Sequence, residues 1–180
     1  MAVILPKQTG TDEGELLFRK SEKITDLEEG IKIVKDLKET LEHYGGVGLA
    51  APQIGISQKV FIVNIVSSGK RSELPHIGLK VYINPEILDV SSETNTDFEG
   101  CLSVFYSTLY GQVGRPNRLR IKYLNMEGKE QTEDTIHPFQ ARVILHENDH
   151  LEGKVFLQRM KSEDFSQLHW EENLDIRKIV

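Results

Sequence analysis

The sequence contains a single cysteine, Cys101, among its 180 residues. An intrachain disulfide is therefore impossible, and the fold must depend on its hydrophobic core, as expected in a reducing compartment. Long apolar runs are missing as well. The best run, 60–66, has the length of a strand, whereas a membrane span needs roughly 20 residues. Basic residues are outnumbered, with 22 Lys and Arg against 28 Asp and Glu, and the resulting net charge of −6 argues against a dedicated nucleic-acid-binding protein.

The length indicates one domain spanning residues 1–180, because domains usually hold about 100–200 residues. A chain of this size can bury roughly two thirds of the surface that it exposes when unfolded. Residues 1–10 contain one lysine and no apolar segment of the signal-peptide type, so we expect neither secretion nor a membrane partner.

The periodicity of apolar residues predicts three helices. In the first, apolar residues recur at helical spacing from Leu27 to Leu41, with Thr25 or Asp26 as the N-cap and Gly45 as the stop. The second follows Pro138, which suits a first helical turn, and the third is expected to begin at Ser162. The expected helices span residues 26–44, 139–151 and 162–170.

Between the first two helices the pattern changes to short runs rich in β-branched residues, which is typical of strands. The predicted strands span residues 60–66, 81–84 with a continuation at 87–90 beyond Pro85, 98–104, 119–123 and 130–136. This order predicts an α+β fold in which a mostly antiparallel sheet packs around a central helix, with an N-terminal and a C-terminal helix.

The strongest chemical signal is the HExxH pattern formed by His146, Glu147 and His150. Residues four apart lie on one face of a helix, so both imidazoles can reach one metal ion. Glu147 stays close to the open side of that ion, where it can take a proton from the attacking water. The sequence therefore predicts a catalytic metal site on the helix at 139–151.

Two histidines leave such a metal without its third protein ligand. The position where one large class of HExxH peptidases carries a third histidine is Phe156 here, although Glu163, Glu171 and Glu172 remain candidates. The upstream candidate is Cys101, since a thiolate is a good ligand for zinc or ferrous iron. A third notable segment, 46–53, contains Gly46, Val47, Gly48 and Gln53, and its small residues indicate a close backbone approach.

Taken together, the segments at 46–53, 99–103 and 146–150 resemble the GxGLAAPQ, EGCLS and HExDH motifs of peptide deformylases, in the same order. Shorter matches, among them Ile83-Asn84-Pro85-Glu86 and Arg115-Pro116, extend the resemblance over about residues 26–160.

The resemblance implies that one divalent metal ion is bound by Cys101, His146 and His150, most typically Fe2+, although Zn2+, Ni2+ or Co2+ can occupy such a site. It further implies that Glu147 is the general base, and that the Gln53 amide and the Leu102 N–H stabilise the oxyanion. The implied substrate is the N-terminal formyl-methionine of nascent polypeptides, met at the ribosome in a bacterial cytoplasm, and the products are formate and the free amine.

The substrate would lie along the edge formed by Gly46, Val47 and Gly48, as an added strand, with its methionine side chain near Val47, Phe139 and Val143. We also expect Glu99 to pair with Arg115, and Asp149 to orient a ligand imidazole.

The chain departs from the family at three places: Leu145 stands where glutamine is usual, the segment from Phe105 to Tyr110 is aromatic, and the N-terminus lacks a Pro-x-Leu-Arg run. These departures keep alternatives open. One is a divergent deformylase-like paralogue with altered specificity or little activity, and another is a binding protein without turnover. An HExxH peptidase of another class is the third, and it is disfavoured by the missing downstream ligand.

Overall fold

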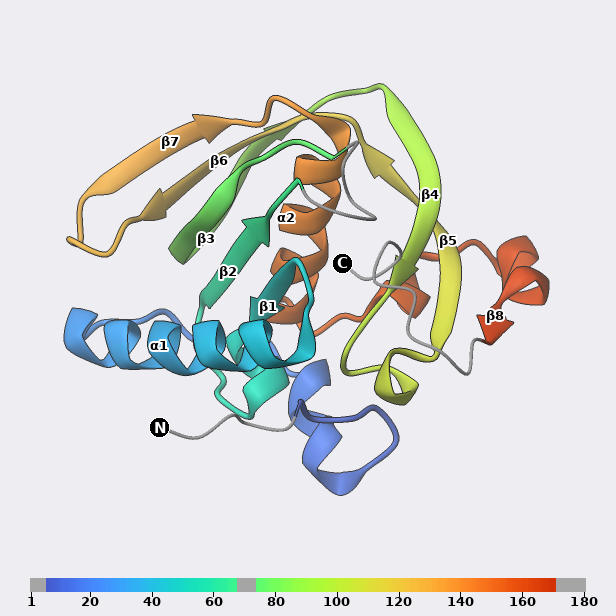
Figure 1. Ribbon diagram of the computed structural model, residues 1–180, viewed down its shortest axis with the longest axis horizontal. Helices are drawn as coiled ribbons and strands as arrows, with labels where there is room; N and C mark the ends of the chain where they lie inside the picture. Colours follow the sequence, from blue (N-terminus) through green and yellow to red (C-terminus); the bar gives the residue numbers. More distant parts are fainter. Residues whose placement is uncertain (1–5, 68–73, 171–180) are drawn as a thin grey trace.

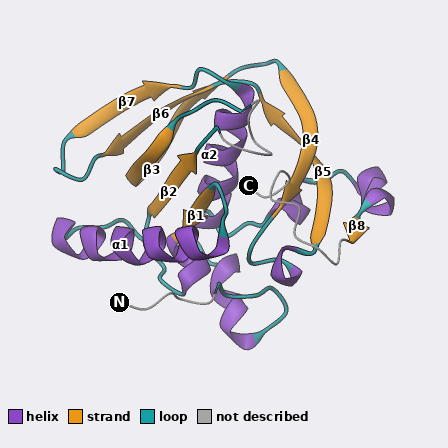
Figure 2. Ribbon diagram, in the orientation of Figure 1, coloured by secondary structure: helices purple, strands orange, loops and turns teal. Residues whose placement is uncertain are grey.

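The computed structural model describes residues 6–67 and 74–170. Two α-helices and two antiparallel sheets form this part of the chain (Figures 1 and 2). The helices are α1 (Leu27–Tyr44) and α2 (Pro138–Leu151). The larger sheet has the strand order β1-β2-β3-β6-β7, with bounds Gly48–Ala50, Val60–Ile65, Gly78–Val90, Leu119–Leu124 and Glu130–Asp134. The smaller sheet has the order β4-β5-β8, with bounds Thr94–Gly100, Leu109–Pro116 and His169–Trp170.

Short 3-10 helices connect these elements. They are η1 (Asp12–Phe18), η2 (Ala51–Ile54), η4 (Phe105–Ser107), η5 (Phe156–Arg159) and η6 (Ser162–Gln167). None of the helices in residues 6–67 and 74–170 is long and apolar enough to cross a membrane.

The larger sheet is covered by α1 on one face and by α2 on the other, so β2 is buried on both sides. In β2, Val60 and Ile62 pack in the cluster that contains the apolar face of α1, whereas Phe61 and Val63 pack in the cluster that contains α2. Successive residues of a strand point to opposite faces, so the apolar run of β2 supplies both layers. The α+β prediction is confirmed.

The boundaries of α1 agree with the sequence prediction. The Asp26 carboxylate accepts a hydrogen bond from the Glu28 N–H at 2.9 Å, as an N-cap does. At the other end Gly45 adopts a left-handed conformation with φ of 78°, and its N–H donates to the Leu41 carbonyl. α2 likewise begins at Pro138, as predicted.

Pro85 does not divide its strand, contrary to the prediction. β3 runs from Gly78 to Val90, and its pairing with β6 shifts register between Ile83 and Glu86. Asn84 there has a φ of 49°, and the extra residue of this bulge accommodates a proline that has no N–H to donate.

Two other predicted elements have different bounds, and two further strands were not predicted. The strand expected over 98–104 is β4, which ends at Gly100 and leaves 101–104 as a turn. The third helix is the 3-10 helix η6, which ends at Gln167, and Trp170 then pairs with Leu109 of β5. Neither β1 nor β5 was predicted, because β1 is short and β5 lacks the alternation of a half-exposed strand.

Candidate metal centre and active site

Three segments far apart in the sequence bring Cys101, His146 and His150 together. Cys101 is the first residue after β4, in a turn where its carbonyl accepts a hydrogen bond from the Val104 N–H at 3.0 Å. Both histidines lie on one face of α2, as residues four apart must. All three side chains are buried. The ligand set suggested by the sequence is therefore assembled in the structure.

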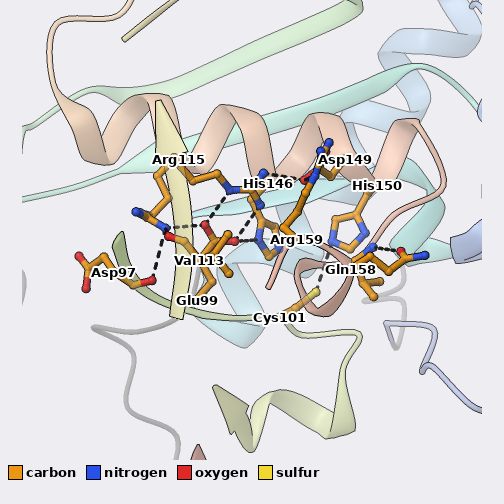
Figure 3. Close-up of polar contacts among 12 residues, drawn as sticks. Asp97, Glu99, Cys101, Val113, Arg115, His146, Asp149, His150, Gln158 and Arg159 are labelled. Atoms are coloured by element: carbon orange, nitrogen blue, oxygen red, sulfur yellow. Dashed lines mark hydrogen bonds and ion pairs between the residues drawn. The ribbon is translucent and has the colours of Figure 1, made fainter. Parts of the chain in front are cut away.

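The donor atoms of these three residues lie within 4.8 Å of one another, and the Cys101 Sγ is 3.3 Å from the His150 Nε2 (Figure 3). One thiolate and two imidazoles are donors that suit zinc or ferrous iron. Such a set leaves one coordination position for water or substrate. The cluster has the composition of a catalytic metal site.

Unpaired polar atoms at this centre test whether a cation fits. Among the described residues, the His146 Nε2, the His150 Nδ1 and both carboxylate oxygens of Glu147 are buried without a hydrogen-bond partner. A buried polar group without a partner costs about 1–3 kcal/mol. The His146 Nε2 and the Glu147 oxygens are the atoms that a cation and its water or substrate would satisfy, whereas the His150 Nδ1 lies across its ring from the nitrogen at Cys101; the residues present therefore fit a divalent metal.

Glu99 fixes the orientation of the first histidine. Its Oε2 lies 3.0 Å from the His146 Nδ1 and accepts the proton of that nitrogen, which leaves the Nε2 lone pair facing the site (Figure 3). Arg115 in turn holds Glu99 through two hydrogen bonds of 2.9 Å. The expected Glu99–Arg115 pair is thus present and buried.

Arg142 is a member of this network that the sequence did not reveal. It lies on α2 and is almost completely buried, and it donates to Glu99 at 2.7 Å and to the Val113 carbonyl at 2.8 Å. An arginine next to apolar residues on a helix gives no local signal for burial. Its partners come from β4 and β5, which are distant in the sequence.

Asp149 does not orient a ligand imidazole, contrary to expectation. Its carboxylate accepts hydrogen bonds from Arg115 at 2.6 Å and from the Arg159 Nε at 2.9 Å. Asp149 therefore supports the metal ligands indirectly: it anchors Arg115, which holds Glu99, which in turn contacts His146.

Burial and neighbouring charges shift the pKa values of Glu99, His150 and Cys101 in different directions. Burial alone would raise the pKa of Glu99, but the charge and hydrogen bonds of Arg115 outweigh it and hold the pKa well below its usual range. Burial lowers the pKa of His150, so this imidazole is neutral, the form that binds metals. Burial raises the pKa of the Cys101 thiol, and a bound cation would counteract this effect.

Glu147 is enclosed on the same side of α2. Burial and the charge of Glu99 raise the pKa of its carboxyl well above the ordinary value. Gly48 of β1 lies directly against it: a Cβ added to Gly48 would be 2.5 Å from the Glu147 Oε1. The glycine suggested by the sequence is therefore required by the close approach of strand and carboxylate.

The Gln53 side chain is directed at the cluster from η2. Its Oε1 accepts a hydrogen bond from the Ala50 N–H at 2.8 Å, which turns the Nε2 toward the Cys101 Sγ, 3.6 Å away, and the Ser103 Oγ, 3.4 Å away. Ser103 was not recognised from the sequence. Leu102 lies in the same turn, and within the described residues its N–H makes no hydrogen bond.

The remaining predicted site residues surround this centre. Val47 and Val143 are both buried in one apolar cluster, against which Phe139 and Leu145 also pack. Gly46 lies close to Leu102, since a Cβ added to it would be 3.6 Å from the Leu102 Cδ1. Of the alternative third ligands, Glu163 is exposed in η6, and Glu171 and Glu172 lie outside the described residues.

Comparison with known proteins gives a consistent result. A family model described as polypeptide deformylase matches residues 7–166. The peptide deformylase of Thermotoga neapolitana is 38% identical over 150 residues, which cover 82% of this chain and 84% of that protein. Peptide deformylase 1 of Clostridium perfringens is 40% identical over 147 residues, covering 81% of this chain and 92% of that protein.

Among solved structures, the Met-Ala-Ser-bound class I type b peptide deformylase from Acinetobacter baumannii aligns with a TM-score of 0.77 at 32% identity, over 88% of this chain and 99% of that chain. Because sequence and fold agree over most of its length, the chain belongs to the polypeptide deformylase family.

Proposed function

We propose that this protein is a metal-dependent hydrolase that removes the formyl group from the N-terminal formyl-methionine of nascent polypeptides and releases formate. The observation that carries the proposal is the buried cluster of Cys101, His146 and His150 with the unpaired carboxylate of Glu147 beside it. An enzyme of this family depends on a metal, and these three side chains would hold it.

When bound, the metal would supply Lewis-acid chemistry, by polarising the formyl carbonyl and making water easier to deprotonate. Glu147 would take the proton from the attacking water and later return it to the departing amine. Its unpaired oxygens support this role, because no hydrogen bond within the described residues competes with water or substrate for them. Placement of a general acid–base group contributes typically 10²–10⁴-fold to a rate.

Two donors would stabilise the negative charge that develops on the formyl oxygen. They are the Gln53 amide, held by the Ala50 N–H, and the Leu102 N–H, which has no partner within the described residues. Donors of this kind are worth about 3–4 kcal/mol each when they are aligned before the reaction. Their fixed positions support assignment of both to the catalytic site.

The peptide would bind along β1, the edge strand of the larger sheet. One side of β1 pairs with β2, with Gly48 opposite Val63, and no other strand of residues 6–67 and 74–170 pairs with β1, so an added strand would pair on its second side. Main-chain pairing would accept any downstream sequence, whereas Val47, Phe139 and Val143 would contact the methionine. The Met-Ala-Ser peptide bound to the Acinetobacter relative supports a substrate of this class.

Fe2+ is the proposed resident ion, because thiolate and imidazole suit ferrous iron. Zn2+, Ni2+ or Co2+ would fit the same donors. We assign all 180 residues to one catalytic domain that meets nascent chains at the ribosome, in the cytoplasm of a bacterium.

The test is formate release by protein purified anaerobically, with formyl-Met-Ala-Ser as the substrate and acetyl-Met-Ala-Ser and unmodified Met-Ala-Ser as controls. We expect one formate for each new amino terminus from the formyl peptide, and little reaction with either control. Cleavage of the unmodified peptide without formate would contradict the proposal and indicate an HExxH peptidase.

A further inference from the structure

A short segment near the N-terminus, Pro6–Thr9, connects the two parts of the chain that carry the proposed oxyanion donors. The Lys7 N–H donates to the Gln53 carbonyl at 2.7 Å, and the Thr9 N–H donates to the Ser103 carbonyl at 2.9 Å. These bonds place the segment, which is blue in Figure 1, between η2 and the turn that follows β4. Pro6–Thr9 therefore spans both donor segments.

Gln8 makes the central contacts of this segment. Its side chain is buried, and its Nε2 donates to the Leu102 carbonyl at 2.8 Å and to the Pro6 carbonyl at 3.1 Å. Its Oε1 accepts a hydrogen bond from the Tyr106 N–H at 2.9 Å. The amide thus uses both of its protons and its oxygen on backbone groups, two of which belong to the active-site turn and the residues after it.

These contacts hold three successive carbonyls of the turn. The Cys101 carbonyl accepts from Val104, the Leu102 carbonyl from Gln8 and the Ser103 carbonyl from Thr9. Each peptide unit is planar, so a fixed carbonyl also fixes the N–H at the other side of its plane. The Leu102 N–H shares its plane with the Cys101 carbonyl, and Gln8 holds the next plane along the chain.

The chain beyond the turn increases the need for such support. Phe105, Tyr106 and Ser107 have φ values of 46°, 54° and 62°, in the left-handed region that non-glycine residues rarely adopt. Conformations of this kind persist when their surroundings hold them in place. Gln8 contacts the residues on either side of the start of this strained stretch, at Leu102 and at Tyr106.

We propose that Gln8 is a positioning residue of the deformylase reaction, which acts by holding the peptide plane that follows Leu102 and so restricts rotation of the adjoining plane, whose Leu102 N–H points at the developing oxyanion. This inference rests on the proposed function. The segment Pro6–Thr9 would thus contribute to the reaction rate and not only to the stability of the fold, because the Gln8 amide binds Leu102, the residue that carries the proposed oxyanion donor.

The test compares three variants with the wild type. Gln8→Met removes all three side-chain hydrogen bonds at nearly constant volume, and Gln8→Glu keeps an acceptor for Tyr106 but cannot donate to Leu102. Thr11→Ala is the control for the Gln8 side chain: Thr11 caps η1 and its Oγ1 donates to the Gln8 carbonyl at 2.9 Å, so its loss weakens the backbone of the segment but leaves all three hydrogen bonds of the Gln8 amide. For each variant, kcat and KM are measured with formyl-Met-Ala-Ser, together with the metal content and the melting temperature.

We expect kcat to fall about tenfold in both Gln8 variants, less than the 10²–10³ that follows complete loss of a donor, with KM within about twofold of wild type. Thr11→Ala should keep the wild-type kcat even where its melting temperature is lower. In zinc-loaded protein, the amide resonance of Leu102 should shift in Gln8→Met and stay in place in Thr11→Ala.

Equal kcat values in Gln8→Met and wild type, or equal losses in Gln8→Met and Thr11→Ala, would overturn the assignment, since Gln8 would then only support the fold. Retention of kcat by Gln8→Glu alone would transfer the effect to Tyr106 and equally overturn it. A wild-type protein that releases no formate would instead contradict the proposed function, and the Leu102 resonance would still test the contact.

Discussion

Replacement of Gly48 by alanine is predicted to disable the site through one added methyl group. The new Cβ would be 2.5 Å from the Glu147 Oε1 and 2.9 Å from its Cδ, whereas ordinary contacts begin at 3.4 Å. Both residues are buried, so the carboxylate must move by about 1 Å to restore a normal separation. A displacement of this size at a reacting group costs about 10²-fold in rate.

The assay is formate release from formyl-Met-Ala-Ser, with kcat and KM determined separately. We expect kcat to fall about 10²-fold and KM to change little, because the backbone groups of Gly48 that would pair with the peptide remain. Crowding in the core should also lower the free energy of unfolding by about 1–3 kcal/mol.

Gly114→Ala provides the control. Gly114 lies in β5, and its added Cβ would meet only the Thr96 Oγ1 at 3.7 Å, an ordinary contact. Neither glycine has a positive φ, so the backbone tolerates alanine at both positions. A folded, metal-loaded Gly48→Ala protein with the kcat of Gly114→Ala would refute the claim that the Glu147 carboxylate must occupy its present position.

Three further predictions concern the support of the site and the core. Arg115→Met leaves Glu99 and Asp149 buried with fewer partners, and should lower the free energy of unfolding in urea by about 3–5 kcal/mol; a loss below about 1 kcal/mol would contradict this. Burial and the charge of Glu133 raise the pKa of Tyr82, so the stability that the protonated Tyr82 contributes is complete below its ordinary pKa near 10 and is lost as the pH rises beyond that value. The free energy of unfolding should therefore fall less steeply with pH above about 10 in Tyr82→Phe than in the wild type. Identical slopes of this free energy against pH would exclude the effect. Removal of the metal with a chelator should abolish formate release and lower the melting temperature, since a ligand at 100 times its Kd stabilises the folded state by about 2.7 kcal/mol. Addition of Fe2+ or Ni2+ should restore the activity and the melting temperature. An unchanged melting temperature after chelation would contradict metal binding at the buried cluster.

The parts of the fold that could be predicted from the sequence are those with a strong local pattern. The apolar spacing and the Asp26 cap define α1, the β-branched run defines β2, and the HExxH spacing places His146 and His150 on one face of α2. The bulge at Asn84 was misjudged because proline normally ends a strand. Here the side chain of Asn84 hydrogen-bonds to the backbone of Ile24 and supports the bulge.

The network behind the ligands could not be predicted, because its contacts join residues that are distant in the sequence. Arg142 can be buried because Glu99, Val113 and Asn95 accept its hydrogen bonds. The expectation that Asp149 orients a ligand imidazole is wrong, because an ionised arginine is the stronger partner for a carboxylate. Gln8 contacts Leu102 across 94 positions of the sequence, and nothing in its local context indicates this.

The central claim is that Cys101, His146 and His150 hold the metal while Glu147 transfers the proton. The most direct test measures bound metal and formate release on the same anaerobic sample of Glu147→Gln, beside Cys101→Ala. The account predicts that Glu147→Gln keeps one metal ion per chain and loses about 10²–10⁴-fold in kcat, whereas Cys101→Ala loses the metal and the activity together. Full metal content and full activity in Cys101→Ala, or wild-type kcat in Glu147→Gln, would contradict it.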